Sequence, residues 1–232
     1  MKLLAIDTSS LACSVALQAG EQIIERHEEQ AREHTRLLMP MIGEVLAEAD
    51  LSIEHLDAIV LGNGPGSFIG MRIAASVAQG LAHGGGIPIA PVSSLAAVAA
   101  EVLEHSAAEE VVVAQDAHMN EVYLGAFRRG NGGMPVPMFD ERLHTQTPVD
   151  ELDEATAGKR FAAGFGWQRY PALAAANENL IGNTSHVLYP RAGYLLRLGA
   201  LVVSESGAIS PGEIMPAYLR NKVAQKPGAA NS

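Results

Sequence analysis

The chain has 232 residues, 48% of them hydrophobic, and a formal net charge of −10 from 16 basic and 26 acidic side chains. This size and composition predict a globular protein of one large domain or two lobes, and they exclude a disordered chain. The acidic balance makes independent binding to nucleic acid unfavourable, because a negative surface repels the phosphate backbone.

Three features of the sequence bear on the compartment. Only four apolar residues precede the acid Asp7, which is too short a run for the core of a signal peptide. The uncharged stretch 73–100 is interrupted by Gly84-Gly85-Gly86, Pro88 and Pro91, which argues against a membrane span. Cys13 is the single cysteine, so no intrachain disulfide can form. We therefore expect a cytoplasmic protein without a membrane segment.

The first third of the chain predicts a β-hairpin followed by a helix. Apolar strands are expected at Lys2–Asp7 and Ala12–Leu17, with a third strand at Gln22–Glu29. The residues Glu33–Ala49 have the apolar period of a helix, with Pro40 in the first turn or at a kink.

The strongest local signal is a strand, a glycine-rich turn and a helix. The strand Leu56–Gly62 runs into the turn GNGPGS, and Ser67 is expected to cap the helix Phe68–His83. This turn lacks the Lys-Ser or Lys-Thr of a Walker loop and the G-x-G-x-x-G spacing of a dinucleotide site, so nucleotide binding by the turn alone is disfavoured.

The helix Phe68–His83 has two apolar rows. Ile69, Ile73, Val77 and Leu81 form a branched aliphatic row, and Gly70, Ala74, Ala78 and Ala82 form a row of small residues. Either both rows lie in the core of one domain, or one of them meets a partner chain. Because a sheet covers only one side of a helix, we expect the small row to face outward and to allow close approach of a partner helix.

Near position 106 the pattern of the N-terminus repeats. An apolar strand at 111–116 ends in Asp116 and is followed by a polar turn and a second strand at 121–127. The repeat predicts an N-terminal lobe at 1–105, a C-terminal lobe at 106–220 and a flexible tail at 221–232. Other expected elements are a strand at 87–90, a helix at 94–104 capped by Ser93, a short helix at 148–157, a strand at 161–165, a helix at 191–205 and an extended segment at 211–222.

Two lobes that each open with a hairpin and an Asp resemble the α/β fold of the actin, hexokinase and heat-shock ATPase superfamily, with duplicated ββαβ-type lobes. In that superfamily glycines in the two hairpin turns grip the phosphates of ATP. Here the turns after Asp7 and Asp116 contain no glycine. Asp7, Thr8 and Asp116 are therefore interpreted as a degenerate nucleotide cleft, and catalysis by this chain is not expected.

Other catalytic chemistry finds little support. His34 has Leu38, and not a second histidine, four residues later, so a metal site on one helix face is not expected. Ser67 stands in P-G-S-F-I, which differs from the G-x-S-x-G nucleophile motif. A phosphotransferase or ATPase of the same superfamily, and a peptidase, remain as alternative functions.

Six motifs together resemble the bacterial TsaB family, also called YeaZ, over 2–226. They are LLAIDTSSLACSVAL, EHTRLLMPMI, GNGPGSFIGMRIAAS, PVSSLAAVA, DAHMNEVYLGAF and MPAYLRNKVA. The chain departs from the family's G-P-G-S-F-T-G-[LV]-R-I pattern at Ile69 and Met71, and both changes keep the positions apolar.

The resemblance implies a non-catalytic subunit of the machinery that adds a threonylcarbamoyl group to the adenosine beside the anticodon of tRNA. It implies pairing with a catalytic paralogue, TsaD, and an ATPase, TsaE, with ATP and a metal used in the partner and no cofactor bound by this chain alone. Contact with tRNA would come only through the complex, and self-association is expected when the partner is absent. The implied partner interface consists of His34, Leu37, Leu38, Met41, Val45, Phe68, Gly70, Met71, Ala74 and Ala78.

Overall fold

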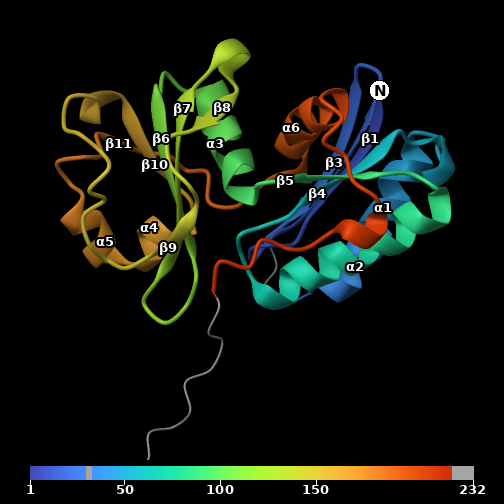
Figure 1. The fold of residues 1–232 in the computed structure, drawn as a ribbon, viewed down its shortest axis with the longest axis horizontal. Helices are drawn as coiled ribbons and strands as arrows, with labels where there is room; N and C mark the ends of the chain where they lie inside the picture. Colours follow the sequence, from blue (N-terminus) through green and yellow to red (C-terminus); the bar gives the residue numbers. More distant parts are fainter. Residues whose placement is uncertain (30–32, 221–232) are drawn as a thin grey trace, which may run out of the picture.

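The computed structural model describes residues 1–29 and 33–220 of the chain. Two β-sheets, each covered by helices, form two lobes that lie side by side (Figure 1). The expected two-lobed α/β architecture is therefore confirmed.

The first sheet has the strand order β3-β2-β1-β4-β5. Its strands are β1 (Lys2–Asp7), β2 (Cys13–Ala19), β3 (Gln22–Glu28), β4 (Ala58–Gly62) and β5 (Ile89–Val92). The first three strands are antiparallel neighbours, as the sequence predicts, whereas β4 and β5 run parallel to β1.

Helices cover both faces of the first sheet. Because side chains alternate along a strand, Leu4 and Ile6 pack beneath α1 (His34–Glu48) and α2 (Phe68–Gly85). Alternate residues of β1 pack on the other face against α6 (Ala192–Ser204), which belongs in sequence to 106–220 but in space to the first lobe. At Gly199 of α6 a Cβ would lie 2.3 Å from a methyl of the underlying strand, so only glycine allows this close approach.

The second sheet repeats the plan of the first. Its path is β11-β10-β6-β7-β8, and β9 also pairs with β7. The hairpin of β6 and β7 is antiparallel, and β10 lies parallel to β6 on its other side, as β4 does to β1. The strands are β6 (Glu110–Asp116), β7 (Val122–Arg129), β8 (Pro135–Pro137), β9 (Arg142–His144), β10 (Arg160–Ala163) and β11 (Asn183–Thr184).

Helices also cover the second sheet. The helix α3 (Ser94–His105), capped by Ser93 as predicted, packs on one face, while α4 (Phe165–Arg169) and α5 (Pro171–Ala176) pack on the other. The sequence did not indicate α4 and α5, because each has fewer than two full turns. Short 3₁₀ helices occupy Ile53–His55, Asn131–Gly133, Ala157–Lys159 and Pro211–Glu213.

The helix expected at 148–157 does not form. Within this range the carboxylate of Asp153 accepts hydrogen bonds from the backbone N–H groups of Ala155 and Thr156, at 2.9 and 3.3 Å. A side chain that takes the backbone donors in this way competes with the helical hydrogen bonds. The segment is therefore a series of turns that ends in a 3₁₀ helix.

Residues 209–220 form what we call the C-terminal strap. The strap starts beside β5, where Ile209 and Ile89 form a β-bridge, and crosses from the first lobe to the second (Figure 1, red). Its extended part after Glu213 agrees with the prediction as far as Arg220. The expected tail at 221–232 lies outside the described residues.

Candidate functional site

The glycine-rich turn lies directly against residues 7–9. A Cβ at Gly62 would lie 2.0 Å from a carboxylate oxygen of Asp7, and a Cβ at Gly66 would lie 2.1 Å from the carbonyl oxygen of Ser9. Gly64, in the same turn, has a φ of +89°, a backbone conformation that favours glycine. The glycines therefore serve close packing between two chain segments, and not a phosphate.

Asp7 is fully buried, and both of its carboxylate oxygens have partners. Its Oδ1 accepts hydrogen bonds of 2.8 Å from the backbone N–H and from the hydroxyl of Ser9, and its Oδ2 accepts one of 2.6 Å from the hydroxyl of Ser94. Burial raises the pKa of Asp7 to about 6, although these hydrogen bonds partly oppose the shift. Thr8 is also fully buried and donates its hydroxyl to the carbonyl oxygen of Gly70 at 2.7 Å. Asp7 and Thr8 therefore hold the lobe together and do not face the cleft.

Asp116 occupies the matching position in the second lobe but has a different exposure. Its Oδ1 accepts hydrogen bonds from the backbone N–H of His118 at 2.8 Å and from the hydroxyl of Tyr170 at 2.7 Å. The following turn has three successive non-glycine residues with positive φ, His118, Met119 and Asn120. The carboxylate remains 21% exposed and lines two cavities.

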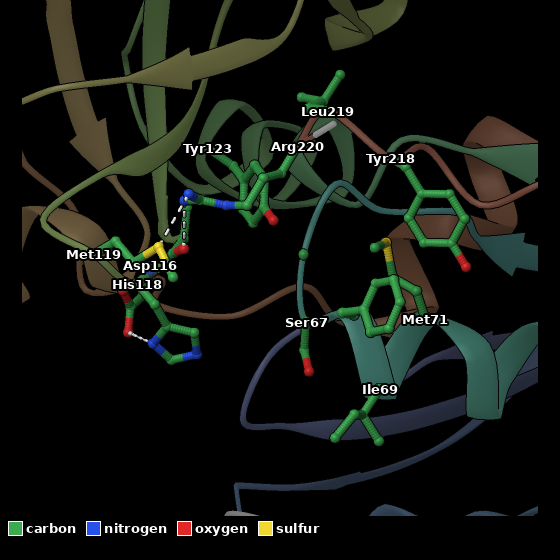
Figure 2. A pocket seen from close by; sticks show the side chains of 13 residues that line it. Ser67, Ile69, Met71, Asp116, His118, Met119, Tyr123, Tyr218, Leu219 and Arg220 are labelled. Atoms are coloured by element: carbon green, nitrogen blue, oxygen red, sulfur yellow. Dashed lines mark hydrogen bonds and ion pairs between the residues drawn. The ribbon is translucent and has the colours of Figure 1, made fainter. Parts of the chain in front are cut away.

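Two adjoining cavities lie at the junction of the lobes. The larger, of about 640 Å³, is bounded by Ser9 and His34 of the first lobe and by Phe165 and Tyr189 of the second. The smaller, of about 280 Å³, lies between the start of α2, the β6–β7 turn and the C-terminal strap (Figure 2). Residues that line both are Ser67, Ile69, Asp116 and His118.

Ser67 and His34 line the larger cavity, and each lies at the start of a helix. The hydroxyl of Ser67 accepts a hydrogen bond from the backbone N–H of Gly70, so it caps α2 as predicted. His34 is buried at the start of α1, where burial lowers its pKa and Nδ1 has no hydrogen-bond partner among the described atoms. Within the described residues, no group of three His, Cys, Asp or Glu side chains is arranged to hold a metal ion.

The orientation expected for α2 is wrong. Ala74 and Ala78 are 0% exposed and pack against the first sheet, and Gly70 lies against the carbonyl oxygen of Thr8. Small side chains let the helix lie close to the sheet, so the small row is its core face. The following residues expected at an exposed interface are buried: His34, Leu38, Met41, Val45, Gly70, Met71, Ala74 and Ala78.

The outward face of the helix pair carries a different set of apolar side chains. Ile69 is 70% exposed, Met39 is 50% exposed and Phe68 is 38% exposed. Partly buried side chains of both helices lie at the edge of the core: Leu37, Ile73, Val77 and Leu81. Of the expected interface, only Phe68 is exposed and only Leu37 is partly buried. The signal for the exposed residues is the aliphatic row that begins at Ile69, which the sequence alone does not distinguish from a core face.

Comparisons with a family model and with curated proteins agree on the family that this chain resembles. A model of the family "TsaD: tRNA N6-adenosine threonylcarbamoyltransferase" matches residues 21–145. The chain is 38% identical to a tRNA threonylcarbamoyladenosine biosynthesis protein TsaB from Haemophilus influenzae, over 97% of this chain and 96% of the relative. It is 34% identical to the TsaB protein of Escherichia coli, over 97% of each chain.

Solved structures give the same fold. YeaZ from Pseudomonas aeruginosa superposes with a TM-score of 0.84 at 33% identity, over 94% of this chain and 99% of the other. A second Pseudomonas aeruginosa structure, described as an uncharacterized protein with similarity to peptidase YEAZ, gives a TM-score of 0.85 at 35% identity over the same shares. In the part of the chain that the structure describes, no helix has the length and apolarity needed to cross a membrane.

Proposed function

Because this chain belongs to the TsaB family of tRNA threonylcarbamoyladenosine biosynthesis proteins, we propose that it is a non-catalytic subunit of the complex that modifies the adenosine beside the anticodon. The observation that carries the non-catalytic role is the state of Asp7. This carboxylate is fully buried and its oxygens are occupied by Ser9 and Ser94, so it cannot reach a nucleotide or a metal in the cleft.

The proposed partners are the catalytic paralogue TsaD and the ATPase TsaE, with ATP and a metal used in the partner. A net charge of −10 supports a role in which tRNA is held by other subunits. The peptidase alternative lacks support at Ser67, whose hydroxyl caps α2. The cytoplasmic location stays a prediction.

The proposed contact surface is the outward face of α1 and α2. Ile69, Met39 and Phe68 expose apolar area there, beside the partly buried aliphatic row of α2. Exposed apolar side chains on neighbouring helices favour a protein partner. Two helices from each chain would cover this face, as in a helix bundle. Without the partner, a second copy of this chain is the expected occupant.

Co-purification with the TsaD paralogue of the same organism tests the proposal. Ile69→Arg should abolish co-purification, because a charge would be buried at the contact. The matched control is Ile23→Arg, since Ile23 is 52% exposed on β3, away from the helix pair, and this variant should keep the partner. Retention of TsaD by the Ile69 variant would place the contact elsewhere, and failure of the unsubstituted chain to bind TsaD would reject the pairing.

A further inference from the structure

The larger cavity between the lobes carries its formal charge on one side. Within the described residues, no lysine or arginine lines it, and its one carboxylate is Asp116. A phosphate site in a protein usually supplies cationic side chains or free N–H groups. The formal charge among the described lining side chains is negative and lies at Asp116, across the cavity from the starts of α1 and α2, so the Asp116 side favours a cationic group.

Asp116 keeps one oxygen available to such a ligand. Its Oδ1 is occupied by the backbone N–H of His118 and the hydroxyl of Tyr170. Its Oδ2 forms one ion pair within the described residues, with the imidazole Nδ1 of His118 at 3.4 Å, and the His118 side chain is itself 83% exposed. No lysine or arginine of the described chain forms an ion pair with this carboxylate. A partly desolvated carboxylate without a cationic partner attracts a cation more strongly than one in bulk water.

An aromatic wall stands in the same cavity. The rings of Phe165 and Tyr189 have centroids 5.7 Å apart and an interplanar angle of 37°. The adjacent backbone holds them in place, because Leu188 accepts hydrogen bonds from the N–H of Phe165 at 3.1 Å and from the side-chain amide of Gln115 at 2.7 Å. Ring faces of this kind stabilise ammonium and guanidinium groups, and they also pack against aliphatic chains.

We propose that the larger cavity binds an organic cation, with an alkylammonium or guanidinium group on Asp116 and the carbon chain against Phe165 and Tyr189. The same chemistry is offered by a free amine or by a lysine or arginine side chain of another protein. This proposal goes beyond the partner role, because the groups that would recognise the cation, Asp116, Phe165 and Tyr189, belong to the second lobe and not to the helix pair, although Ile69 also lines the cavity.

Agmatine is a suitable probe, because it carries a guanidinium and an ammonium group on a short chain. In an NMR titration of the full ¹⁵N-labelled chain, agmatine should shift the amide signals of Gln115, Phe165 and Tyr189. The uncharged analogue butylurea and Mg-ATP should leave them unchanged. Added salt should weaken the binding, because it screens the carboxylate.

Matched variants separate the two recognition elements. Asp116→Asn keeps the acceptor for His118 and Tyr170 but removes the charge, and it should weaken agmatine binding roughly tenfold or more. Tyr189→Leu should weaken it roughly threefold to tenfold. Glu178→Gln, an exposed carboxylate outside both cavities, should have no effect. Thermal melts would show whether each variant is folded.

Two results would overturn the proposal: no shift of the cavity signals at about 10 mM agmatine, or a shift that Asp116→Asn leaves unaltered in a folded protein. The source of the cation is decided by adding agmatine to the complex with TsaD. If agmatine releases the partner, the cation that the cavity binds is a side chain of the partner. If the complex stays intact and still binds agmatine, the cation is a free amine.

Discussion

Ser94, the first residue of α3, donates its hydroxyl at 2.6 Å to Oδ2 of Asp7, the last residue of β1. The same Ser94 oxygen accepts a hydrogen bond of 3.1 Å from the backbone N–H of Gly64. One hydroxyl thus joins the end of the first strand, the glycine-rich turn and the start of the helix between the two sheets. A carboxylate held in this way is a structural group.

This burial predicts a pH dependence of stability. The pKa of Asp7 is about 6 in the folded protein and 3.8 in an exposed carboxyl, so the folded state holds its proton more strongly. The stability contributed by protonated Asp7 is complete below pH 3.8 and is lost as the pH rises through about 6. The loss between about pH 4.5 and 7.5 should be about 2 kcal/mol.

Asp7→Asn removes this titration and keeps the shape of the side chain. Urea unfolding across the same pH range should therefore show a shallower decline of the unfolding free energy in the variant. Glu101 and Glu141, whose pKa values burial raises to about 7, titrate in the same direction in both proteins, so they cancel in the difference. Equal slopes in the two proteins would mean that Asp7 is not a buried titrating group.

The packing of Gly70 gives a second prediction. A Cβ at this position would lie 1.9 Å from the carbonyl oxygen of Thr8, a backbone atom that cannot turn aside. Gly70→Ala should therefore lower the unfolding free energy by about 2 kcal/mol or more. Gly80 lies in the same helix, and a Cβ added there would meet no atom within 4 Å, so Gly80→Ala should raise it by about 0.5 to 1 kcal/mol. Similar effects of the two substitutions in denaturant unfolding would contradict this packing.

The sequence predicts the first lobe well, because its signals are local. Strand periodicity and the cap at Ser67 lie within short windows of its sequence. The sequence could not orient α2, because its aliphatic and small rows are both apolar and only the distance to the sheet decides which is inside. It also could not show that Asp7 is buried, since its donor Ser94 is 87 residues away.

The second lobe was harder to predict, because long-range polar contacts shape it. Arg160 is fully buried at the start of β10, where its guanidinium pairs with Glu110 at 2.6 Å and donates to the carbonyl oxygens of Asp153 and Leu180. From the sequence, one arginine at the start of a strand does not reveal which distant residues it contacts. The contacts fix the turns at 153–156, which have no regular secondary structure of their own.

The core position of Ala78 gives a third prediction. Its side chain is 0% exposed against the first sheet, so Ala78→Arg would force a long, unpaired charge into the core. We expect a loss of at least about 3 kcal/mol and a large drop in folded protein. Circular dichroism would measure it, with Ser76→Arg on the exposed side of the same helix as the control. A folded Ala78 variant would mean that the small row does face outward.

The last prediction concerns the C-terminal strap, which forms hydrogen bonds with the first lobe and, at its other end, with the second lobe. In the first lobe Asn63 donates its side-chain amide to the carbonyl oxygen of Met215 at 2.9 Å. In the second lobe Arg220 pairs with Glu121 at 2.6 Å and donates to the carbonyl oxygen of Ala117 at 2.9 Å. The side chains of Arg220 and Glu121 are only 18% and 29% exposed, so solvent screens their interaction weakly.

A double-mutant cycle of Arg220→Ala and Glu121→Ala should therefore give a coupling free energy of about 1 kcal/mol or more in chemical unfolding. The matched control is the pair of Lys159 and Glu109, whose side chains are 62% and 52% exposed. Because exposed ion pairs are strongly screened, this control cycle should give less than about 0.5 kcal/mol. The Arg220 variant should also exchange the amide hydrogen of Ala217 faster, since that N–H bonds to Asn63 only while the strap is in place. A coupling no larger than that of the control, with unchanged exchange at Ala217, would show that the strap does not depend on Arg220.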